Sequence, residues 1–480
     1  MTKPLQILFA GFEGEPFIKT GGLGDVIGSL PSAIAATGCD VRVMLPKLKT
    51  IPEKYTSQMQ FLGSFNVPLS WRIQYCGLFA LQHKGITFYF LDNEYYFGRD
   101  SVYGYDDDGE RIAFYSKAVV EAIQYIDGFA PEILHCHDWH TALAPVFLRE
   151  NYMELELYRR IKTVFTIHNL KFQGQFPGDM LDYVLGLGNT PAADQLRQGG
   201  SINFMQAAVR YADYVTTVSP TYAEEICTGA YGEGMDWLFR ELRYKLAGIL
   251  NGIDVDKYNP ETDDAVAVPF NGDSLNNKLQ SKLALQRELG LYEDADTPLI
   301  AVVSRLTDQK GFQLIDQVMP GLMDKKCQLV VLGLGDKRFE DMFKYYGSQY
   351  PDRVAPLITF NDELARKIYA ASDLFLMPSQ FEPCGLSQMI AMRYGTLPLV
   401  RRTGGLYDSV NPLGIEDNPT GFGFYDFTAS ALYNTTAFAL GVYENEPDTW
   451  RYMQHNAITT DFSWNASAKR YRELYAYLLG

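Results

Sequence analysis

Short runs of apolar residues alternate with longer segments of helical periodicity along the first half of the chain. The apolar runs are continuous, which is typical of strands buried on both faces of a parallel sheet. We expect strands at residues 5–10, 41–45, 86–91, 133–136, 163–167 and 214–218. Helical spacing falls between several of them, at residues 30–37, 112–125, 142–149 and 205–211. This alternation predicts a doubly wound α/β domain.

Two β-rich runs at residues 61–67 and 73–81 lie close together, and we expect them to form an antiparallel extension of the first sheet.

The alternation of apolar runs and helical segments returns in the second half of the chain after a break. The pattern loosens between residues 244 and 277. It resumes with strands expected at residues 299–303, 328–332, 374–377 and 397–400, which indicate a second Rossmann-like unit. We therefore predict two doubly wound domains, at residues 1–246 and 247–461, followed by an amphipathic helix within residues 462–480.

Composition narrows the class of protein. A chain of 480 residues with 47% apolar and 21% charged residues is typical of a globular enzyme of two domains. Its net charge of −16 argues against nucleic acid or an anionic membrane surface as a partner. The 6 cysteines form no C-x-x-C pair, which favours reduced thiols and a cytoplasmic location. No window approaches the ~18 apolar residues of a membrane span, and the first apolar run is better explained by a buried strand than by a signal peptide.

Polar residues with useful chemistry follow the ends of the expected strands. Open α/β sheets bind ligands beyond the carboxyl ends of their strands, so we expect residues in these loops to line one cleft. They come from both halves of the chain: Lys19, His137, Asp138, His168, Arg305 and Glu382.

The stretch from Ser379 to Leu406 combines an acid with a predicted helix N-terminus. A helix that starts near Ser387 points its unpaired N–H groups into the loop that contains Glu382, and such an end favours an anion. The pair Gly404 and Gly405 offers backbone for another close approach. This combination suits an enzyme that binds a phosphate and a neighbouring polyol.

Cations accompany this predicted phosphate site. Arg305 and Lys310 flank a loop between a strand and a helix, where a guanidinium fork and a point charge meet one diphosphate. We expect both to neutralise the charge that develops on a leaving group. Lys19 precedes a glycine-rich loop that includes Gly21 and Gly22, where backbone N–H groups can approach phosphate or sugar.

Two other clusters invite a metal interpretation that we do not favour. His135, Cys136, His137 and His140 lack the second Cys/His cluster that would complete a zinc site. The acids from Asp106 to Asp108 resemble a manganese-binding pair but lie in a loop that is rich in tyrosine and glycine, which favours a solvated loop. We expect no metal and no other cofactor.

Five ordered signatures carry a family resemblance over essentially the whole chain. They are Lys19–Asp25, His135–His140, Thr166–Asn169, Ser304–Leu306 with Lys310 and Gly311, and Ser379–Leu406. The chain is similar to bacterial glycogen synthases and plant starch synthases, which are retaining glucosyltransferases that use ADP-glucose. The resemblance implies a GT-B fold with two Rossmann-like domains, a last helix that crosses back to the first domain, and an α-1,4-glucan as the acceptor.

The resemblance also implies roles for individual residues. It assigns catalytic roles to Glu382, His168, Arg305, Lys310 and Lys19. It places Gly21, Gly22, Asn169, Asn251, Phe360, Cys384, Gly385, Leu386, Ser387, Thr403, Gly404 and Gly405 at the sugar nucleotide. It places Asp138, Trp139, Asp25 and Tyr95 at the glucan.

Some alternatives remain open from the sequence. Phe360 stands where the family usually has Tyr, and Ser387 where it usually has Thr, so the nucleotide preference of this chain can differ. A UDP-glucose-dependent synthase and a catalytically idle glucan-binding scaffold are therefore the rival hypotheses. Glu382 has no partner acid in a matched motif, so we expect it to support a cationic transition state rather than to act as a covalent nucleophile.

Overall fold

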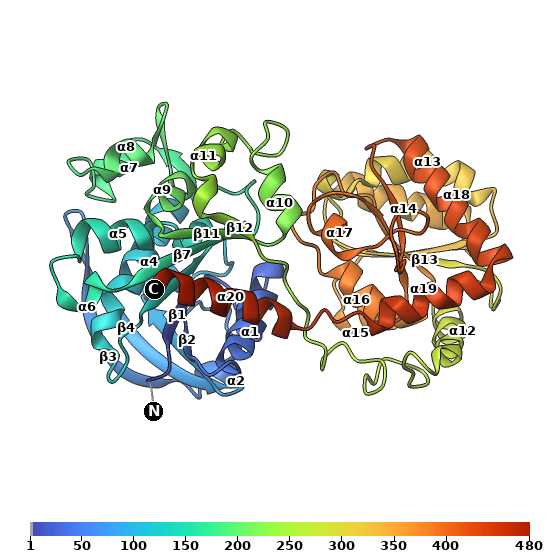
Figure 1. Cartoon of the computed structure of the whole chain (residues 1–480), viewed down its shortest axis with the longest axis horizontal. Helices are drawn as coiled ribbons and strands as arrows, with labels where there is room; N and C mark the ends of the chain where they lie inside the picture. Colours follow the sequence, from blue (N-terminus) through green and yellow to red (C-terminus); the bar gives the residue numbers. More distant parts are fainter. Residues whose placement is uncertain (1–2) are drawn as a thin grey trace. The chain divides into compact units, whose positions relative to one another are not determined.

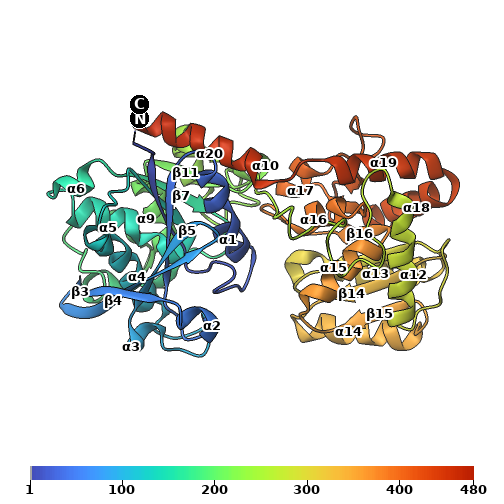
Figure 2. The ribbon, with the colours of Figure 1, turned by 90° about the horizontal axis from the view of Figure 1, so that it is seen from below.

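The computed structural model describes residues 3–480, which divide into two compact units. The first unit comprises the residues up to Gly252 together with Trp464–Gly480, and the second comprises Ile253–Ser463. The change of unit falls a few residues after the position expected from the sequence, because β12 (Leu246–Gly248) pairs with the first sheet. The last helix, α20 (Trp464–Leu479), belongs to the first unit and runs beside α1 (Gly22–Ala35), as Figures 1 and 2 both show.

A nine-stranded sheet forms the centre of the first unit, in the order β12-β11-β7-β6-β1-β2-β5-β4-β3. The strands from β12 to β5 are parallel, whereas β4 and β3 are antiparallel, as the sequence predicts. The other strands are β1 (Gln6–Ala10), β2 (Asp40–Pro46), β3 (Gln60–Leu69), β4 (Arg72–His83), β5 (Ile86–Asp92), β6 (Ile133–His137), β7 (Lys162–Ile167) and β11 (Tyr214–Thr217).

The helices of the first unit cross between these strands. The remaining ones are α2 (Glu53–Thr56), α3 (Glu94–Phe97), α4 (Asp108–Ala122), α5 (Leu143–Asn151), α6 (Glu156–Arg159), α7 (Met180–Tyr183), α8 (Ala192–Leu196), α9 (Phe204–Tyr211), α10 (Pro220–Glu225) and α11 (Asp236–Glu241). A small sheet of β8 (Gln175–Pro177), β10 (Ser201–Asn203) and β9 (Arg197–Gln198) was not predicted, because strands of two or three residues carry no periodicity.

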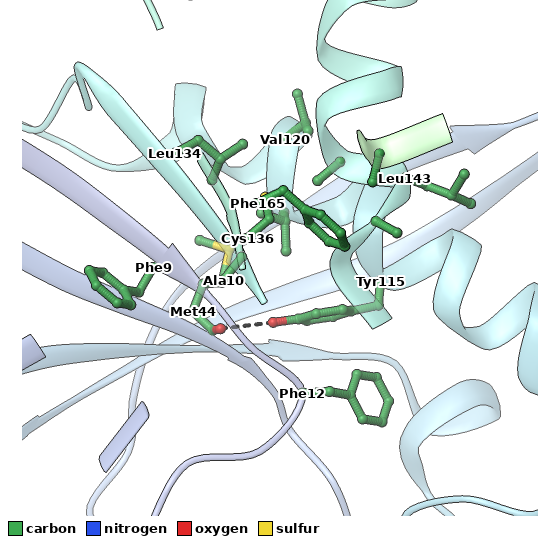
Figure 3. Packing of buried hydrophobic residues seen from close by; sticks show 14 of the residues in the cluster. Phe9, Ala10, Phe12, Met44, Tyr115, Val120, Leu134, Cys136, Leu143 and Phe165 are labelled. Carbon is green, nitrogen blue, oxygen red and sulfur yellow. Dashed lines mark hydrogen bonds between the residues drawn. The ribbon is translucent and has the colours of Figure 1, made fainter. Parts of the chain in front are cut away.

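The core of the first unit lies between the central strands and α4 (Figure 3). Phe9 and Phe165 are fully buried in neighbouring parts of the sheet. Burying each such side chain contributes about 1.5–3 kcal/mol. Tyr115 of α4 satisfies its buried hydroxyl by donating to the backbone oxygen of Met44 over 2.8 Å. The apolar runs noted in the sequence are therefore buried on both faces of the sheet.

The second unit contains a six-stranded parallel sheet in the order β15-β14-β13-β16-β17-β18. Its strands are β13 (Leu299–Val303), β14 (Gln328–Leu332), β15 (Val354–Leu357), β16 (Leu374–Met377), β17 (Leu397–Arg401) and β18 (Phe422–Phe424). Its helices are α12 (Lys278–Glu288), α13 (Phe312–Met323), α14 (Lys337–Gln349), α15 (Asp362–Ala371), α16 (Ser387–Arg393), α17 (Gly404–Ser409), α18 (Ala429–Asn445) and α19 (Pro447–Thr459).

Both sheets share the strand order of a doubly wound fold. In the second sheet the order reverses between β13 and β16, and in the first it reverses between β1 and β6. At such a switch point the loops diverge and leave a crevice for a ligand. Two Rossmann-like units are therefore confirmed, and each has one preferred ligand position. Within residues 3–480, no helix has the length and apolar character needed to traverse a bilayer.

Candidate active site

The loop after β1 borders the switch point of the first sheet and is held by a buried acid. Glu13 accepts hydrogen bonds from the backbone N–H and the hydroxyl of Thr20, over 2.5 and 2.6 Å, and from the hydroxyl of Tyr103 over 2.6 Å. Helix α1 then begins at Gly22, with Gly21 as its N-cap. No heavy atom lies within 4 Å of a Cβ built on Gly21 or Gly22, so packing within the described chain does not require glycine there.

Lys19 lies just ahead of this helix and is held by two acids. Its Nζ donates to Asp25 over 2.6 Å and to Glu15 over 3.2 Å. Burial raises the pKa of Asp25 to about 6, and the Lys19 charge opposes that rise. The sequence predicts that Lys19 binds phosphate, but in this structure Lys19 contacts two carboxylates. A bound anion would have to compete with them.

Asp138 follows β6 across the same switch point and has an unusual backbone conformation. Its φ of 57° and ψ of −179° lie in a region that is nearly restricted to glycine. Its Oδ1 accepts the backbone N–H of His168 over 2.7 Å. Burial raises the pKa of Asp138 to about 7, although the backbone N–H groups of His168 and Asn169 oppose the rise. The strain is therefore coupled to the loop that follows β7.

Histidine rings form a buried group behind this loop. His137 Nδ1 lies 2.9 Å from His168 Nε2. His135 contacts the Tyr475 hydroxyl of α20 over 2.7 Å and the Thr166 hydroxyl over 2.6 Å. Burial lowers the pKa of His168 to about 3 and that of His137 well below its usual value. The rings are neutral at pH 7, and no group of three or more His, Cys, Asp or Glu within residues 3–480 is arranged to hold a metal.

The remaining predicted residues of the first unit differ in exposure. Trp139 is half-buried and packs against Phe176, with ring centroids 5.9 Å apart. Tyr95 in α3 is 64% exposed, which leaves its ring available to a sugar. Asn169 accepts the N–H of Lys171 over 3.1 Å. Asn251 is buried at the end of the unit, and its Oδ1 has no hydrogen-bond partner among the described residues.

In the second unit the switch point brings Lys310 and Glu382 together. Lys310 Nζ donates to Glu382 Oε2 over 2.6 Å, and the Ser379 hydroxyl donates to the same oxygen over 3.0 Å. Gly311, with φ of 77°, allows this approach, because a Cβ there would overlap the backbone oxygen of Pro378. Arg305 is exposed, and its guanidinium has no partner within the described part of the chain.

The predicted helix start at Ser387 is confirmed by α16, but the glycine pair has a role that the sequence did not reveal. Gly405 donates its N–H to the backbone oxygen of Glu382 over 3.0 Å. A Cβ on Gly404 would overlap that oxygen, and one on Gly405 would overlap the backbone oxygen of Cys384. The close approach that these glycines permit is therefore to the Glu382 loop itself, which α17 holds in place.

Other predicted donor-site residues lie just ahead of α15, α16 and α17. Cys384 and Thr403 are buried, and Gly385 has a φ of 71°. Leu386 is half-buried and occupies the N-cap position of α16. Phe360 precedes α15 and is 82% exposed, so its ring is free to stack on a flat ligand group.

Among the acids from residue 106 to residue 108, Asp107 and Asp108 are tied into the fold, whereas Asp106 is exposed. Asp107 pairs with Arg99 over 2.7 Å, and Asp108 accepts the N–H groups of Gly104 and Tyr105 over 2.8 and 3.2 Å. Asp108 also pairs with Arg111 of its own helix. Ion pairs with arginines and hydrogen bonds to the preceding loop account for Asp107 and Asp108, whereas the sequence suggested only a solvated loop.

Sequence reasoning missed two residues that organise the site. Glu13 holds the loop after β1, and Ser379 shares the Glu382 oxygen with Lys310. Both lie in strand-exit loops, which is the signal that could have identified them.

Two Rossmann-like units with charged and polar loops at their switch points define a glycosyltransferase with the two-domain GT-B fold, and the comparisons with known proteins agree. The family model of the starch synthase catalytic domain matches residues 6–241, and that of glycosyl transferases group 1 matches residues 288–438. The chain belongs to the glycogen and starch synthase family.

Relatives match along the full length of the chain. The glycogen synthase of Streptococcus mutans serotype c is 49% identical and covers 99% of this chain and 100% of its own. That of Desulforamulus reducens is 48% identical over 99% of each chain. The catalytic domain of starch synthase IV from Arabidopsis thaliana, bound to ADP and acarbose, has a TM-score of 0.92 at 32% identity, with 99% and 100% coverage. Sucrose-phosphate synthase from Thermosynechococcus elongatus, at 20% identity, a TM-score of 0.62 and 99% coverage of both chains, shares the fold.

Proposed function

We propose that the chain transfers glucose from ADP-glucose to the non-reducing end of an α-1,4-glucan with retention of configuration, in the cytoplasm. The observation that carries the proposal is the ion pair of Lys310 with the buried Glu382 at the switch point of the second sheet, with the exposed Arg305 in the same loop as Lys310. A relative with a TM-score of 0.92 is bound to ADP, which supports an adenine nucleotide as a ligand of this chain.

The cations supply the chemistry of the leaving group. Cleavage of the glycosidic bond leaves negative charge on the diphosphate of ADP, and fixed positive groups stabilise that charge as it develops. Arg305 is free to provide a planar fork, and Lys310 provides a point charge that is already oriented by Glu382. Lys19 of the first unit is a further cation that can pair with a phosphate in place of Asp25 and Glu15.

Glu382 is better suited to hold a sugar hydroxyl than to attack the anomeric carbon. Its Oε2 already accepts hydrogen bonds from Lys310 and Ser379, which occupy the lone pairs that an attacking oxygen would need. Its Oε1 has no protein partner in residues 3–480 and is not enclosed, so it is available to a ligand. The departing phosphate then serves as the base for the acceptor hydroxyl, which attacks from the same face of the sugar.

The other predicted contacts complete the proposal. Gly21 and Gly22 leave open space at the N-terminus of α1, where a phosphate or sugar oxygen finds unpaired N–H groups. Asp138 and Trp139 offer a hydrogen-bonding acid and an apolar platform to the glucan. No step requires a metal, because positive side chains are present for the diphosphate.

The test is a chain-extension assay with glycogen, EDTA and either ADP-glucose or UDP-glucose. We expect activity in EDTA and a kcat/KM at least tenfold higher for ADP-glucose, together with an α-linked product. A preference for UDP-glucose supports the rival donor, and binding of glycogen without turnover of either donor supports the scaffold hypothesis. Loss of activity in EDTA that Mn²⁺ restores, or a trapped glucosyl adduct on Glu382, would contradict the mechanism.

A further inference from the structure

His137 is a buried ring whose two nitrogens have unequal surroundings. Its Nδ1 lies 2.9 Å from His168 Nε2, whereas its Nε2 is buried and has no hydrogen-bond partner among the described residues. The ring is held in place by stacking: its centroid lies 5.2 Å from that of Phe9 and 4.2 Å from that of His135. It therefore cannot turn to find another partner without disturbing the core.

These surroundings decide where the protons lie. A neutral imidazole carries one N–H, and burial lowers the pKa of both histidines so that each ring is neutral. If His168 donated to His137, the single proton of His137 would sit on the enclosed Nε2 and remain unpaired. Orphaned buried N–H groups are rarer and costlier than orphaned acceptors. The favoured arrangement has His137 Nδ1–H donating to His168 Nε2.

We propose that His137 is a positioning residue that fixes His168 as the tautomer with its proton on Nδ1. The role in catalysis rests on the proposed function and on the catalytic role near the transferred glucose that the family resemblance implies for His168. His168 Nδ1 has no protein partner in the described chain and is not enclosed, so its N–H is available to donate to a sugar oxygen. The opposite tautomer would present a lone pair at that position instead.

A second contact fixes the orientation of the same residue. Asp138 Oδ1 accepts the backbone N–H of His168 over 2.7 Å, so His168 is held through both its backbone and its ring. A substrate oxygen then meets a donor whose direction is set before binding. Such preorganisation favours catalysis because no reorientation is needed when charge develops.

Three variants separate this role from packing. His137→Phe keeps a ring in the stack and removes the donor, and His137→Asn places an amide donor where Nδ1 was. Tyr475→Phe is the matched control, because it removes the hydrogen bond of His135 and leaves the pair of His137 and His168 intact. We expect His137→Phe to lower kcat about tenfold, the effect of one hydrogen bond, with KM within twofold. His137→Asn should recover kcat to within about threefold, and Tyr475→Phe should leave kcat unchanged.

Nitrogen-15 NMR of histidine-labelled, ligand-free protein tests the tautomer directly. We expect the His168 signals, identified by their loss in His168→Gln, to show a protonated Nδ1, and His137→Phe to abolish this preference. This readout does not depend on turnover, so a failure of the proposed function leaves it standing. A protonated Nε2 on His168 in the native protein would overturn the inference. Equal kcat for His137→Phe and wild type, or equal losses for His137→Phe and His137→Asn, would do the same.

Discussion

At the scale of single residues, Asp138 combines a strained backbone with a hydrogen bond to the loop after β7. A non-glycine residue held in a sparsely populated backbone region costs about 1–3 kcal/mol. The cost persists here because the carboxylate receives the N–H of His168. A glycine would remove the strain, whereas an alanine would keep it, and both would lose the acceptor.

Asp138→Gly and Asp138→Ala therefore form a matched pair. We expect the glycine variant to be more stable to urea than the alanine variant by about 1–2 kcal/mol, the strain that glycine relieves. Both should lose most chain-extension activity, because the proposed contact with the glucan is gone. Equal free energies of unfolding for the two variants would show that the backbone conformation carries no strain.

We expect different effects from truncating Arg305 and Lys310, the two cations of the second unit with a predicted catalytic role. Arg305 is exposed without a protein partner among residues 3–480, so Arg305→Ala should change the free energy of unfolding by less than about 0.5 kcal/mol. Its kcat should fall by at least about a hundredfold, the loss found when a donor to a developing anion is removed. Lys310→Ala should lose both activity and about 3 kcal/mol of stability, because it leaves the Glu382 carboxylate buried and unpaired.

Thermal or urea unfolding and steady-state kinetics check this contrast. The double variant Lys310→Met with Glu382→Gln should recover stability without activity, since no buried charge remains. Near-normal turnover in Arg305→Ala would remove that residue from the mechanism.

At the scale of elements, α12 is anchored by a buried lysine. Lys278 Nζ lies near four oxygens: the backbone oxygens of Tyr369, Ala370 and Tyr394, and the hydroxyl of Thr396, at 2.7–3.1 Å. These backbone oxygens belong to the C-terminal ends of α15 and α16, where a positive charge is favourable. One lysine side chain, whose pKa burial lowers to about 7, thus joins three helices and secures the far end of the helix that starts at Ser387.

Replacing Lys278 by Met should destabilise the chain by about 3 kcal/mol or more, because buried acceptors lose their donor. The control is Arg287→Met on the same helix. Arg287 forms an exposed pair with Glu293, which contributes little to stability because water screens the two charges. Urea unfolding of both variants measures the difference, and equal losses would contradict the anchoring role of Lys278.

The elements also show how far the sequence leads. Long apolar runs predicted most parallel strands of both sheets, and the spacing after the Glu382 loop predicted α16 from its first residue. Strands of two or three residues, such as β9 and β18, escaped because no period is visible over so few positions. Within the site, strand-exit placement identified Lys310 and Glu382 separately. Their mutual bond spans 72 residues and depends on the order of the strands, which no local pattern encodes.

At the scale of the whole molecule, buried neutral histidines make stability depend on pH. Burial lowers the pKa of His140 and His168 to about 3 and that of His135 and His137 well below 6.5. Because the folded-state pKa values are depressed, the unfolded chain binds more protons than the folded chain below pH 6.5. The stability that these neutral histidines contribute is fully present above that pH and is lost as the pH falls. Asp138, whose pKa is raised, has the opposite sign between pH 4 and 7 and offsets part of the loss.

Urea unfolding between pH 7.5 and 4.5 tests this dependence with His140→Phe as the variant. Each such histidine contributes a slope of about 1.4 kcal/mol per pH unit below its unfolded pKa. Below the unfolded pKa of histidine, the unfolding free energy of the variant should therefore fall less steeply with decreasing pH than that of the wild type. The difference between the two slopes should be about that value. Identical pH profiles would show that His140 is not held neutral in the folded protein.

The membership of α20 in the first unit has a consequence for biosynthesis. The second unit lies in sequence between Gly252 and Trp464, so a ribosome makes all of it before α20 emerges. Until then His135 has no phenol from Tyr475 to meet its ring, and the surface that α20 covers is open to water. The first unit therefore stays incomplete on the ribosome while the second unit is translated. That interval gives chaperones their longest opportunity to bind the uncovered surface.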